Sequence, residues 1–270
     1  MSAGKHTQFY QALRCEKGDC EISSLELIGE EPLMIHIDEK PYSVVMRTPG
    51  EEVVHAVGLC LGEGIIDTLD DIKTIGYDPD LDPNMIDIWL TPGHRKKIKN
   101  LLKRQSYISQ TSCGICGKKM VEDLNQVLEP VKNGFKVDIR QIFDCVEMLS
   151  KTQNYYPRTR GSHAALLFDH HLKMISFAED VGRHNALDKA IGKAFMEKKL
   201  SEASLLVLSS RISYELVQKA ARAHLPMMIS KSRPTALAVK MGQALNMTLA
   251  CAFGESKLLI LCGENRIIKE

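Results

Sequence analysis

The sequence predicts a mixed α/β protein (α+β overall), in which a small N-terminal sheet with one helix precedes a larger sheet covered by helices. The chain has 270 residues, of which 44% are hydrophobic, so it can bury one large core or two modest ones. Short alternating apolar segments and one amphipathic helix fill residues 21–108. From about residue 163, strand-like segments alternate with helical ones, which is typical of a mixed, largely parallel sheet.

The small N-terminal domain is expected to contain five strands and one helix, after an irregular segment over residues 1–20. The helix should begin at Thr48-Pro49-Gly50-Glu51, where Thr48 can cap it and Glu51 can complete a capping box. Its buried stripe would comprise Val53, Val54, Val57 and Leu61. The strands are expected at 21–28, 33–37, 42–46, 72–77 and 85–90.

The larger domain is expected over residues 121–270, after a mobile cysteine loop at 109–120. Apolar periodicity predicts helices near 119–128, 138–153, 186–195, 214–223 and 235–245. The segments between them predict strands at 164–168, 174–177, 205–208, 227–229, 249–253 and 258–261. Such alternation places helices on both faces of a mixed sheet, in three α/β/α layers.

Two thiols in the cysteine loop, Cys113 and Cys116, are the most reactive groups that the sequence suggests. They stand two residues apart in Cys113-Gly114-Ile115-Cys116, which Lys118 and Lys119 follow. A thiol reacts as its thiolate, which nearby positive charge or a helix N-terminus stabilises. The glycines allow the backbone to bend and a partner sulfur to approach. We therefore predict a loop that presents sulfur to other molecules, with Cys113 and Cys116 as catalytic residues.

Charge and hydropathy restrict the environment of the protein. A formal net charge of +1 gives no general attraction to nucleic acid or to a membrane surface. The first residues contain no apolar run typical of a signal peptide, and no stretch approaches the roughly 18 apolar residues of a membrane helix. We expect a cytoplasmic protein that binds neither nucleic acid nor membrane. Its eight cysteines should be mostly reduced.

Two loops combine hydroxyl groups with cations between a predicted strand and a predicted helix. One contains Ser209, Ser210 and Arg211, and the other contains Lys231 and Ser232. Free N–H groups and partial positive charge at helix N-termini suit phosphate groups. If the two strands are neighbours, the loops share the crevice where open α/β sheets bind ligands. The alternative is that these serines are ordinary helix caps and the cations are solvated.

A third polar segment, residues 179–189, also lies between a strand and a helix. Arg183 and His184 could face the same crevice. Alternatively, Asp180 and Arg183 form a structural ion pair, and His163 and His184 make structural hydrogen bonds.

Several of these segments form an ordered set: 30–33, 46–50, 58–66, 112–118, 179–189, 211–219 and 234–239. Together they resemble the FdhD/NarQ family of formate dehydrogenase accessory proteins, over about residues 22 to 262. The resemblance implies a cytidine-deaminase-like fold for residues 121–270. It also implies a sulfurtransferase that takes persulfide sulfur from a cysteine desulfurase onto Cys113, with Cys116 as the second cysteine.

The same resemblance implies a cofactor and partners. The sulfur would pass to the molybdenum cofactor, bis-molybdopterin guanine dinucleotide, before that cofactor enters the catalytic subunit of formate dehydrogenase. The protein would be a homodimer without a structural metal. The family's cofactor-contacting stretch falls on Ala252, Phe253, Gly254, Glu255, Ser256 and Lys257.

Other functions remain open from the residues alone. In a zinc-stabilised, nucleotide-binding accessory scaffold without sulfur chemistry, Cys113 and Cys116 would bind zinc together with Cys15 and Cys20, and His163 is a further candidate ligand. A thioredoxin-like oxidoreductase would normally carry its motif early in a βαβ unit. A zinc deaminase requires H-x-E and P-C-x-x-C, and this sequence lacks the glutamate after His163 and a proline before Cys113.

Overall fold

The structure is a computed structural model that describes residues 6–99, 128–132, 134–254 and 256–269. Cys113, Cys116, the predicted cysteine loop and Glu255 lie outside the described residues, as does most of the helix expected near 119–128. None of the described helices is long and apolar enough to cross a membrane.

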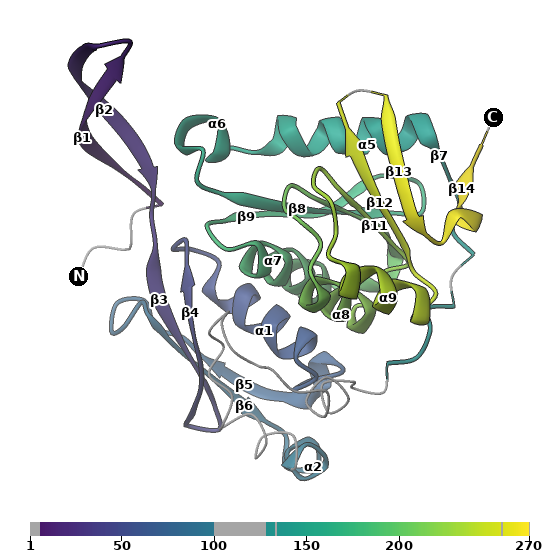
Figure 1. The fold of residues 1–270 in the computed structure, drawn as a ribbon. Helices are drawn as coiled ribbons and strands as arrows, with labels where there is room; N and C mark the ends of the chain where they lie inside the picture. The colour runs from purple at the N-terminus through teal and green to yellow at the C-terminus, as the bar shows by residue number, and fades with distance from the viewer. Residues whose placement is uncertain (1–5, 100–127, 133, 255, 270) are drawn as a thin grey trace.

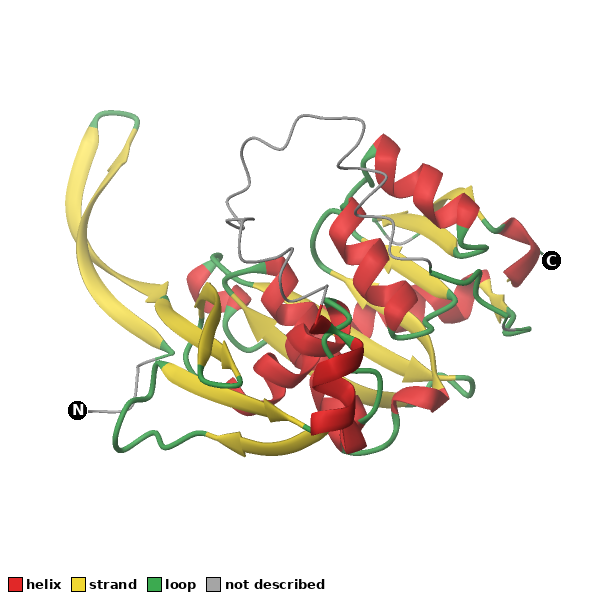
Figure 2. Cartoon of the chain, turned by 90° about the horizontal axis from the view of Figure 1, so that it is seen from below, coloured by secondary structure: helices red, strands yellow, loops and turns green. Residues whose placement is uncertain are grey.

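The N-terminal residues form a β-hairpin, which corrects the prediction of an irregular segment over residues 1–20. Strand β1 (Thr7–Glu16) pairs antiparallel with β2 (Asp19–Ile28), and both views show the hairpin standing away from the rest of the chain (Figures 1 and 2). Lys17 and Gly18 connect the strands, both with positive φ, which suits a tight two-residue hairpin turn. The strand expected at 21–28 corresponds to β2, whereas the sequence did not predict β1, because almost none of the hairpin's side chains is buried.

A four-stranded sheet of order β4-β3-β6-β5 follows, and helix α1 covers one of its faces. Alternate side chains, such as Ile86, Ile88 and Leu90, are fully buried, so the period-2 pattern correctly predicted a sheet with one covered face. The elements are β3 (Glu31–Ile37), β4 (Lys40–Arg47), α1 (Glu52–Gly62), β5 (Ile72–Gly76) and β6 (Met85–Leu90). A short helix that the sequence did not predict, α2 (Pro92–Lys97), follows β6.

Helix α1 begins later than its sequence predicted. Its N-cap is Glu51, in the left-handed region at φ 65°, so the expected capping box of Thr48 and Glu51 is wrong. The Thr48 hydroxyl instead accepts a hydrogen bond from the amide of Val181, 3.0 Å away. A contact with a distant segment therefore replaces the local cap.

The larger sheet has six strands in the order β13-β12-β11-β10-β8-β9. Its central strands β10, β11 and β12 are parallel to one another, whereas β8, β9 and β13 pair antiparallel. The predicted mixed sheet is therefore confirmed, but the expectation that it is largely parallel is wrong, because three of its five strand pairings are antiparallel. The strands are β8 (His163–Asp169), β9 (Met174–Asp180), β10 (Ala203–Leu208), β11 (Met227–Ser230), β12 (Thr248–Phe253) and β13 (Lys257–Cys262).

Helices cover both faces of this sheet and give the three predicted layers (Figure 1). One face packs against α5 (Ile139–Thr152), through Leu205 and Val207 of β10. The other face packs against α7 (Arg183–Met196), α8 (Tyr214–Arg222) and α9 (Ala236–Ala244). The remaining short elements are α6 (Tyr156–Thr159), β7 (Val137–Asp138) and β14 (Ile267–Ile268).

The small sheet and the large sheet share one core, because α1 packs directly on α7. Two glycines allow the close approach of these helices. A Cβ on Gly58 would lie 1.9 Å from the carbonyl oxygen of Asp188, and one on Gly192 would lie 1.9 Å from that of Val54. Buried side chains from both sheets accordingly belong to a single hydrophobic cluster.

Candidate functional site

The parallel strands β10, β11 and β12 all end at one edge of the large sheet, and α8 and α9 begin there. The register pairs Leu208 with Ser230 and Ser230 with Cys251, so the three strand ends lie side by side. The antiparallel pairing of His163 with Asp180 brings the N-terminus of α7 to the same edge. This arrangement, which we call the carboxyl edge, gathers three helix N-termini as the predicted crevice required.

The two predicted anion loops are in contact at the carboxyl edge. The hydroxyl of Ser230 lies 2.5 Å from the carbonyl oxygen of Ser210, and the amide of Thr235 donates to the carbonyl of Ile212 at 3.0 Å. These bonds tie the loop before α8 to the loop before α9. The expectation that both loops share one side of the sheet is therefore confirmed.

The serines of these loops hold the edge together. Ser209 accepts a hydrogen bond from the amide of Ala164 at 2.8 Å, and Ser210 is buried. Ser232 donates its amide to the hydroxyl of Ser230 at 2.9 Å. Thr235 caps α9 through the amide of Ala238 at 3.2 Å. The serine hydroxyls here bond strands and loops and do not cap helices, which the alternative interpretation had expected, and Thr235 is the residue that acts as a cap.

Exposed cations supply the positive charge of the carboxyl edge. Arg211 and Lys231 are exposed on adjacent loops, and Lys231 donates to the hydroxyl of Ser150 at 2.8 Å. The guanidinium carbon of Arg233 lies 5.8 Å from the centre of the Phe253 ring, at the end of β12. The sequence interpretation did not select Arg233, because its partner becomes adjacent only when β11 and β12 pair.

The stretch 252–257 includes the end of β12 and the first residue of β13 at this same edge, and Glu255 within it lies outside the described residues. Ala252 is buried, Phe253 is half-buried, and Gly254 has φ 58°. Ser256 and Lys257 are exposed beyond the turn. Phe253 therefore presents an aromatic ring next to a cation, a combination that can stack a planar base.

The N-terminus of α7 adds Arg183 and His184. The His184 Nε2 atom lies 3.4 Å from the Ser213 hydroxyl and 3.8 Å from a carboxylate oxygen of Glu215. The neighbouring His184 lowers the pKa of Glu215 to about 2. Burial, followed by the charges of Arg183 and His184, lowers the pKa of His163. Burial therefore favours the neutral form of His163, while Arg183 is cationic and Glu215 is ionised at neutral pH.

Asp180 pairs with Lys189, and the suggested structural pair of Asp180 with Arg183 is therefore wrong. Its carboxylate lies 2.7 Å from Lys189 Nζ and accepts hydrogen bonds from the amides of Thr48 and Gly182 at 3.1 and 2.9 Å. Asn185 donates to it at 2.9 Å. The pair is almost completely buried, and it joins the N-terminal region to the start of α7.

Glu179, the preceding residue, is also structural. Its carboxylate accepts hydrogen bonds from the amides of Asn154, Tyr155 and Tyr156 at 2.6 to 2.9 Å, and from the hydroxyl of Ser162. The polar residues of segment 179–189 therefore have two roles. Glu179 and Asp180 make buried structural contacts, and Arg183 and His184 lie at the carboxyl edge.

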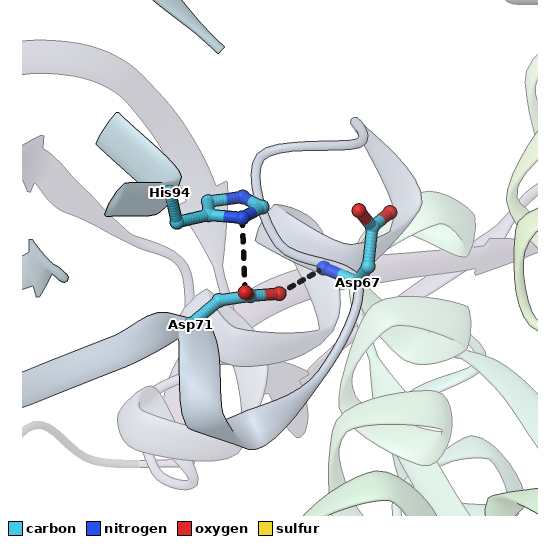
Figure 3. A group of neighbouring side chains, drawn as sticks. All are labelled: Asp67, Asp71 and His94. Atoms are coloured by element: carbon cyan, nitrogen blue, oxygen red, sulfur yellow. Dashed lines mark hydrogen bonds and ion pairs between the residues drawn. The ribbon is translucent and has the colours of Figure 1, made fainter. Parts of the chain in front are cut away.

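One group of metal-ligating residue types occurs in the part of the chain that the structure describes: Asp67, Asp71 and His94 (Figure 3). Other groups of the same chain already form hydrogen bonds or ion pairs with these side chains. His94 bonds Asp71 at 2.9 Å through Nδ1 and the carbonyl oxygen of Ile65 at 2.7 Å through Nε2. Asp67 pairs with Lys97 and Arg222, each at 2.7 Å. The group therefore stabilises the start of β5 and needs no ion.

The zinc hypothesis combined Cys113 and Cys116 with Cys15 and Cys20, and included His163 as a further candidate ligand. Cys15 and Cys20 are joined in a disulfide across the β1–β2 hairpin. They are therefore not available as zinc ligands in this state, and they are an exception to the expectation that the cysteines are mostly reduced. The described cysteines outside the hairpin, Cys60, Cys145, Cys251 and Cys262, are free and buried, as expected for core packing. Burial raises the pKa of the Cys145 thiol to about 12, which makes it unreactive.

A sequence profile of the FdhD/NarQ family matches residues 28–268. The chain belongs to the FdhD/NarQ family. It is 31% identical to the sulfur carrier protein FdhD of Streptomyces coelicolor, over 98% of this chain and 96% of that protein. It is 34% identical to the protein of the same name from Anaeromyxobacter dehalogenans strain 2CP-C, over 84% of this chain and 83% of that protein.

The fold of this FdhD/NarQ chain also matches a solved structure. A protein from Desulfotalea psychrophila, described as a formate dehydrogenase accessory protein, superimposes with a TM-score of 0.78. The match covers 98% of this chain and 100% of that chain at 18% sequence identity. At that identity the similarity concerns the fold, and it agrees with the small sheet, α1 and three-layer arrangement described above.

Proposed function

We propose that the protein is a sulfur carrier that accepts persulfide sulfur from a cysteine desulfurase on Cys113. It transfers this sulfur to bis-molybdopterin guanine dinucleotide before that cofactor enters the catalytic subunit of formate dehydrogenase. The names of its relatives support the sulfur-carrying role. The observation that carries the cofactor assignment is the carboxyl edge, where three helix N-termini meet Arg211, Lys231 and Arg233.

The residues of the carboxyl edge fit a guanine dinucleotide chemically. Helix N-termini and exposed cations favour phosphate groups, and the Phe253 ring beside Arg233 offers a face for a base. Within this proposal Arg211, Lys231 and Arg183 bind phosphate, and His184 donates a hydrogen bond. The cofactor is the substrate of the sulfur transfer, and a homodimer is the proposed assembly.

The sulfur step is an exchange at sulfur. The Cys113 thiolate attacks the outer sulfur of the desulfurase persulfide and displaces the desulfurase thiolate, so that Cys113 gains the sulfane sulfur. Cys116 then attacks the inner sulfur of the Cys113 persulfide, which breaks the S–S bond, forms a Cys113–Cys116 disulfide and releases the outer sulfur as hydrosulfide. The test is mass spectrometry after incubation with a cysteine desulfurase and cysteine. Wild-type protein should gain the mass of one sulfur atom, and Cys113→Ala should gain none. Unchanged loading of that variant would refute the assignment.

Nucleotide binding is tested separately with GDP as the probe. Arg233→Ala should weaken GDP binding about tenfold, equivalent to about 1.4 kcal/mol, because one charge-assisted contact is lost. The matched control is Lys173→Ala, which removes an exposed cation from the β8–β9 turn at the opposite edge of the sheet. Equal affinities of the two variants, measured by calorimetry, would rule out Arg233 as a ligand.

The second candidate is a nucleotide-binding scaffold without sulfur chemistry. This scaffold would bind its nucleotide at the same carboxyl edge. One experiment separates the two candidates: with the scaffold, Cys113→Ala would support formate dehydrogenase maturation as well as wild type does.

A further inference from the structure

The tip of the β1–β2 hairpin holds two sulfur atoms that the proposed function does not use. Cys15 and Cys20 occupy directly opposite positions in the antiparallel register, with 4.1 Å between their Cα atoms. The two-residue turn at Lys17 and Gly18 fixes this register. The hairpin therefore keeps the two sulfurs adjacent whenever its strands are paired.

Other molecules can reach these sulfurs. Cys15, Cys20 and every residue between them are exposed. The hairpin contacts the rest of the protein near its base, where Glu26 pairs with Arg158 at 3.1 Å and Gly29 donates to the carbonyl of His6 at 2.7 Å. The tip projects away from the described body of the chain, as Figure 1 shows.

This disulfide is poorly placed for a purely structural role. A cross-link stabilises mainly by closing a long loop, and a six-residue loop gives roughly 2 kcal/mol, the low end of the usual range. It joins no two elements of the core, since β1 and β2 already pair along their whole length. Exposed disulfides are also the ones that thiols reduce most readily, whereas structural ones resist reduction. These features are typical of a disulfide that is opened and closed during function.

We propose that Cys15 and Cys20 form a thiol–disulfide exchange site whose substrates are a hydropersulfide and a dithiol reductant. The assignment of a hydropersulfide rests on the proposed function, because a sulfur carrier handles sulfane sulfur. Delivery of that sulfur as sulfide consumes two electrons, and a pair of adjacent thiols supplies two.

The reaction balances in two steps. The Cys15 thiolate attacks the outer sulfur of a hydropersulfide, R–S–SH, and releases the thiol R–SH, which leaves a persulfide on Cys15. The Cys20 thiolate then attacks the inner sulfur, expels hydrosulfide and closes the disulfide. In total, two thiols and R–S–SH give one disulfide, R–SH and H₂S. A dithiol reductant reopens the disulfide and is itself oxidised. The second step is fast because the register holds both sulfurs together, which makes it intramolecular.

The test uses the full chain with Cys113→Ser and Cys116→Ser, so that the loop cysteines cannot contribute. The protein is reduced, freed of reductant and mixed with glutathione persulfide. We expect about one equivalent of H₂S per chain, because each dithiol turns over once. Peptide mass mapping should find the Cys15–Cys20 disulfide re-formed. Adding Cys15→Ser or Cys20→Ser to this background should lower H₂S release at least tenfold, after subtraction of spontaneous decay.

Two results would overturn the proposal. One is H₂S release that neither serine substitution changes. The other is a disulfide that stays closed when the folded protein is treated with a dithiol reductant. Thiol alkylation at residues 15 and 20 measures whether it has opened. The proposed function is tested in a different experiment, in which a cysteine desulfurase loads sulfur onto the protein with Cys113 intact; absence of loading there would be its failure. The two assays therefore fail independently.

Discussion

Replacing Asp180 by asparagine should destabilise the protein more than replacing its ion-pair partner Lys189 by methionine. Asp180 has no exposed surface and Lys189 is 1% exposed, so neither charge is hydrated when the other is removed. In Asp180→Asn the ammonium of Lys189 loses its anionic partner. It keeps its hydrogen bond to the carbonyl oxygen of Thr48, 2.8 Å away. The substitution also turns an amide NH₂ toward groups that themselves donate hydrogen bonds.

The expected cost of Asp180→Asn is about 3–5 kcal/mol, the usual cost of leaving one buried charge uncompensated. Lys189→Met should cost less, about 1–3 kcal/mol, because the carboxylate keeps three N–H donors, from Thr48, Gly182 and Asn185. The double variant should cost less than the sum of the single variants, since it removes both charges.

Urea unfolding followed by circular dichroism measures these differences. With a slope of about 3 kcal/mol per M, Asp180→Asn should lower the unfolding midpoint by about 1–2 M. The reasoning fails if Asp180→Asn costs less than about 1 kcal/mol, or if Lys189→Met proves the more costly change. Either result would mean that water or rearranged side chains reach this joint.

Two further predictions concern stability. Gly192→Ala should cost about 3 kcal/mol, because its Cβ would lie 1.9 Å from the carbonyl oxygen of Val54, whereas Gly93→Ala at an open position should change little; equal melting temperatures would contradict the packing argument. Burial, followed by the charges of Lys189 and Lys219, lowers the pKa of His55 well below its usual value. Below about pH 6.5 the unfolded chain therefore binds a proton that the folded protein excludes, and stability should fall by up to about 1.4 kcal/mol per pH unit. Thermal unfolding between pH 7.5 and 5.5 should show a shallower slope for His55→Gln, and an unchanged slope would contradict this assignment.

The hydrophobic pattern predicted most elements of the large sheet because their periodicity follows from burial on one face or both. The strand at 205–208 is a continuous apolar run, and β10 is buried along its whole length. Strand β1 of the hairpin could not be found in this way, although the strand expected at 21–28 corresponds to β2, since the exposed hairpin has no buried face. His55 is a similar case. The apolar pattern of α1 leaves His55 on the polar side of the helix, but α7 and α8 cover that side, and the histidine is buried.

The sequence by itself determined the family, the mixed α/β class and the strand–loop–helix turns with their cations, because motifs and periodicity are properties of the chain. Only the tertiary structure decided which of these groups meet. The parallel pairing of β10, β11 and β12 placed Arg233 against Phe253. It also directed the serine hydroxyls of the two loops to backbone groups of the carboxyl edge. The packing of β9 against α7 placed Asp180 beside Lys189 instead of Arg183. Partners of this kind are separated by many residues, and local preferences cannot specify a contact that depends on how distant elements pack.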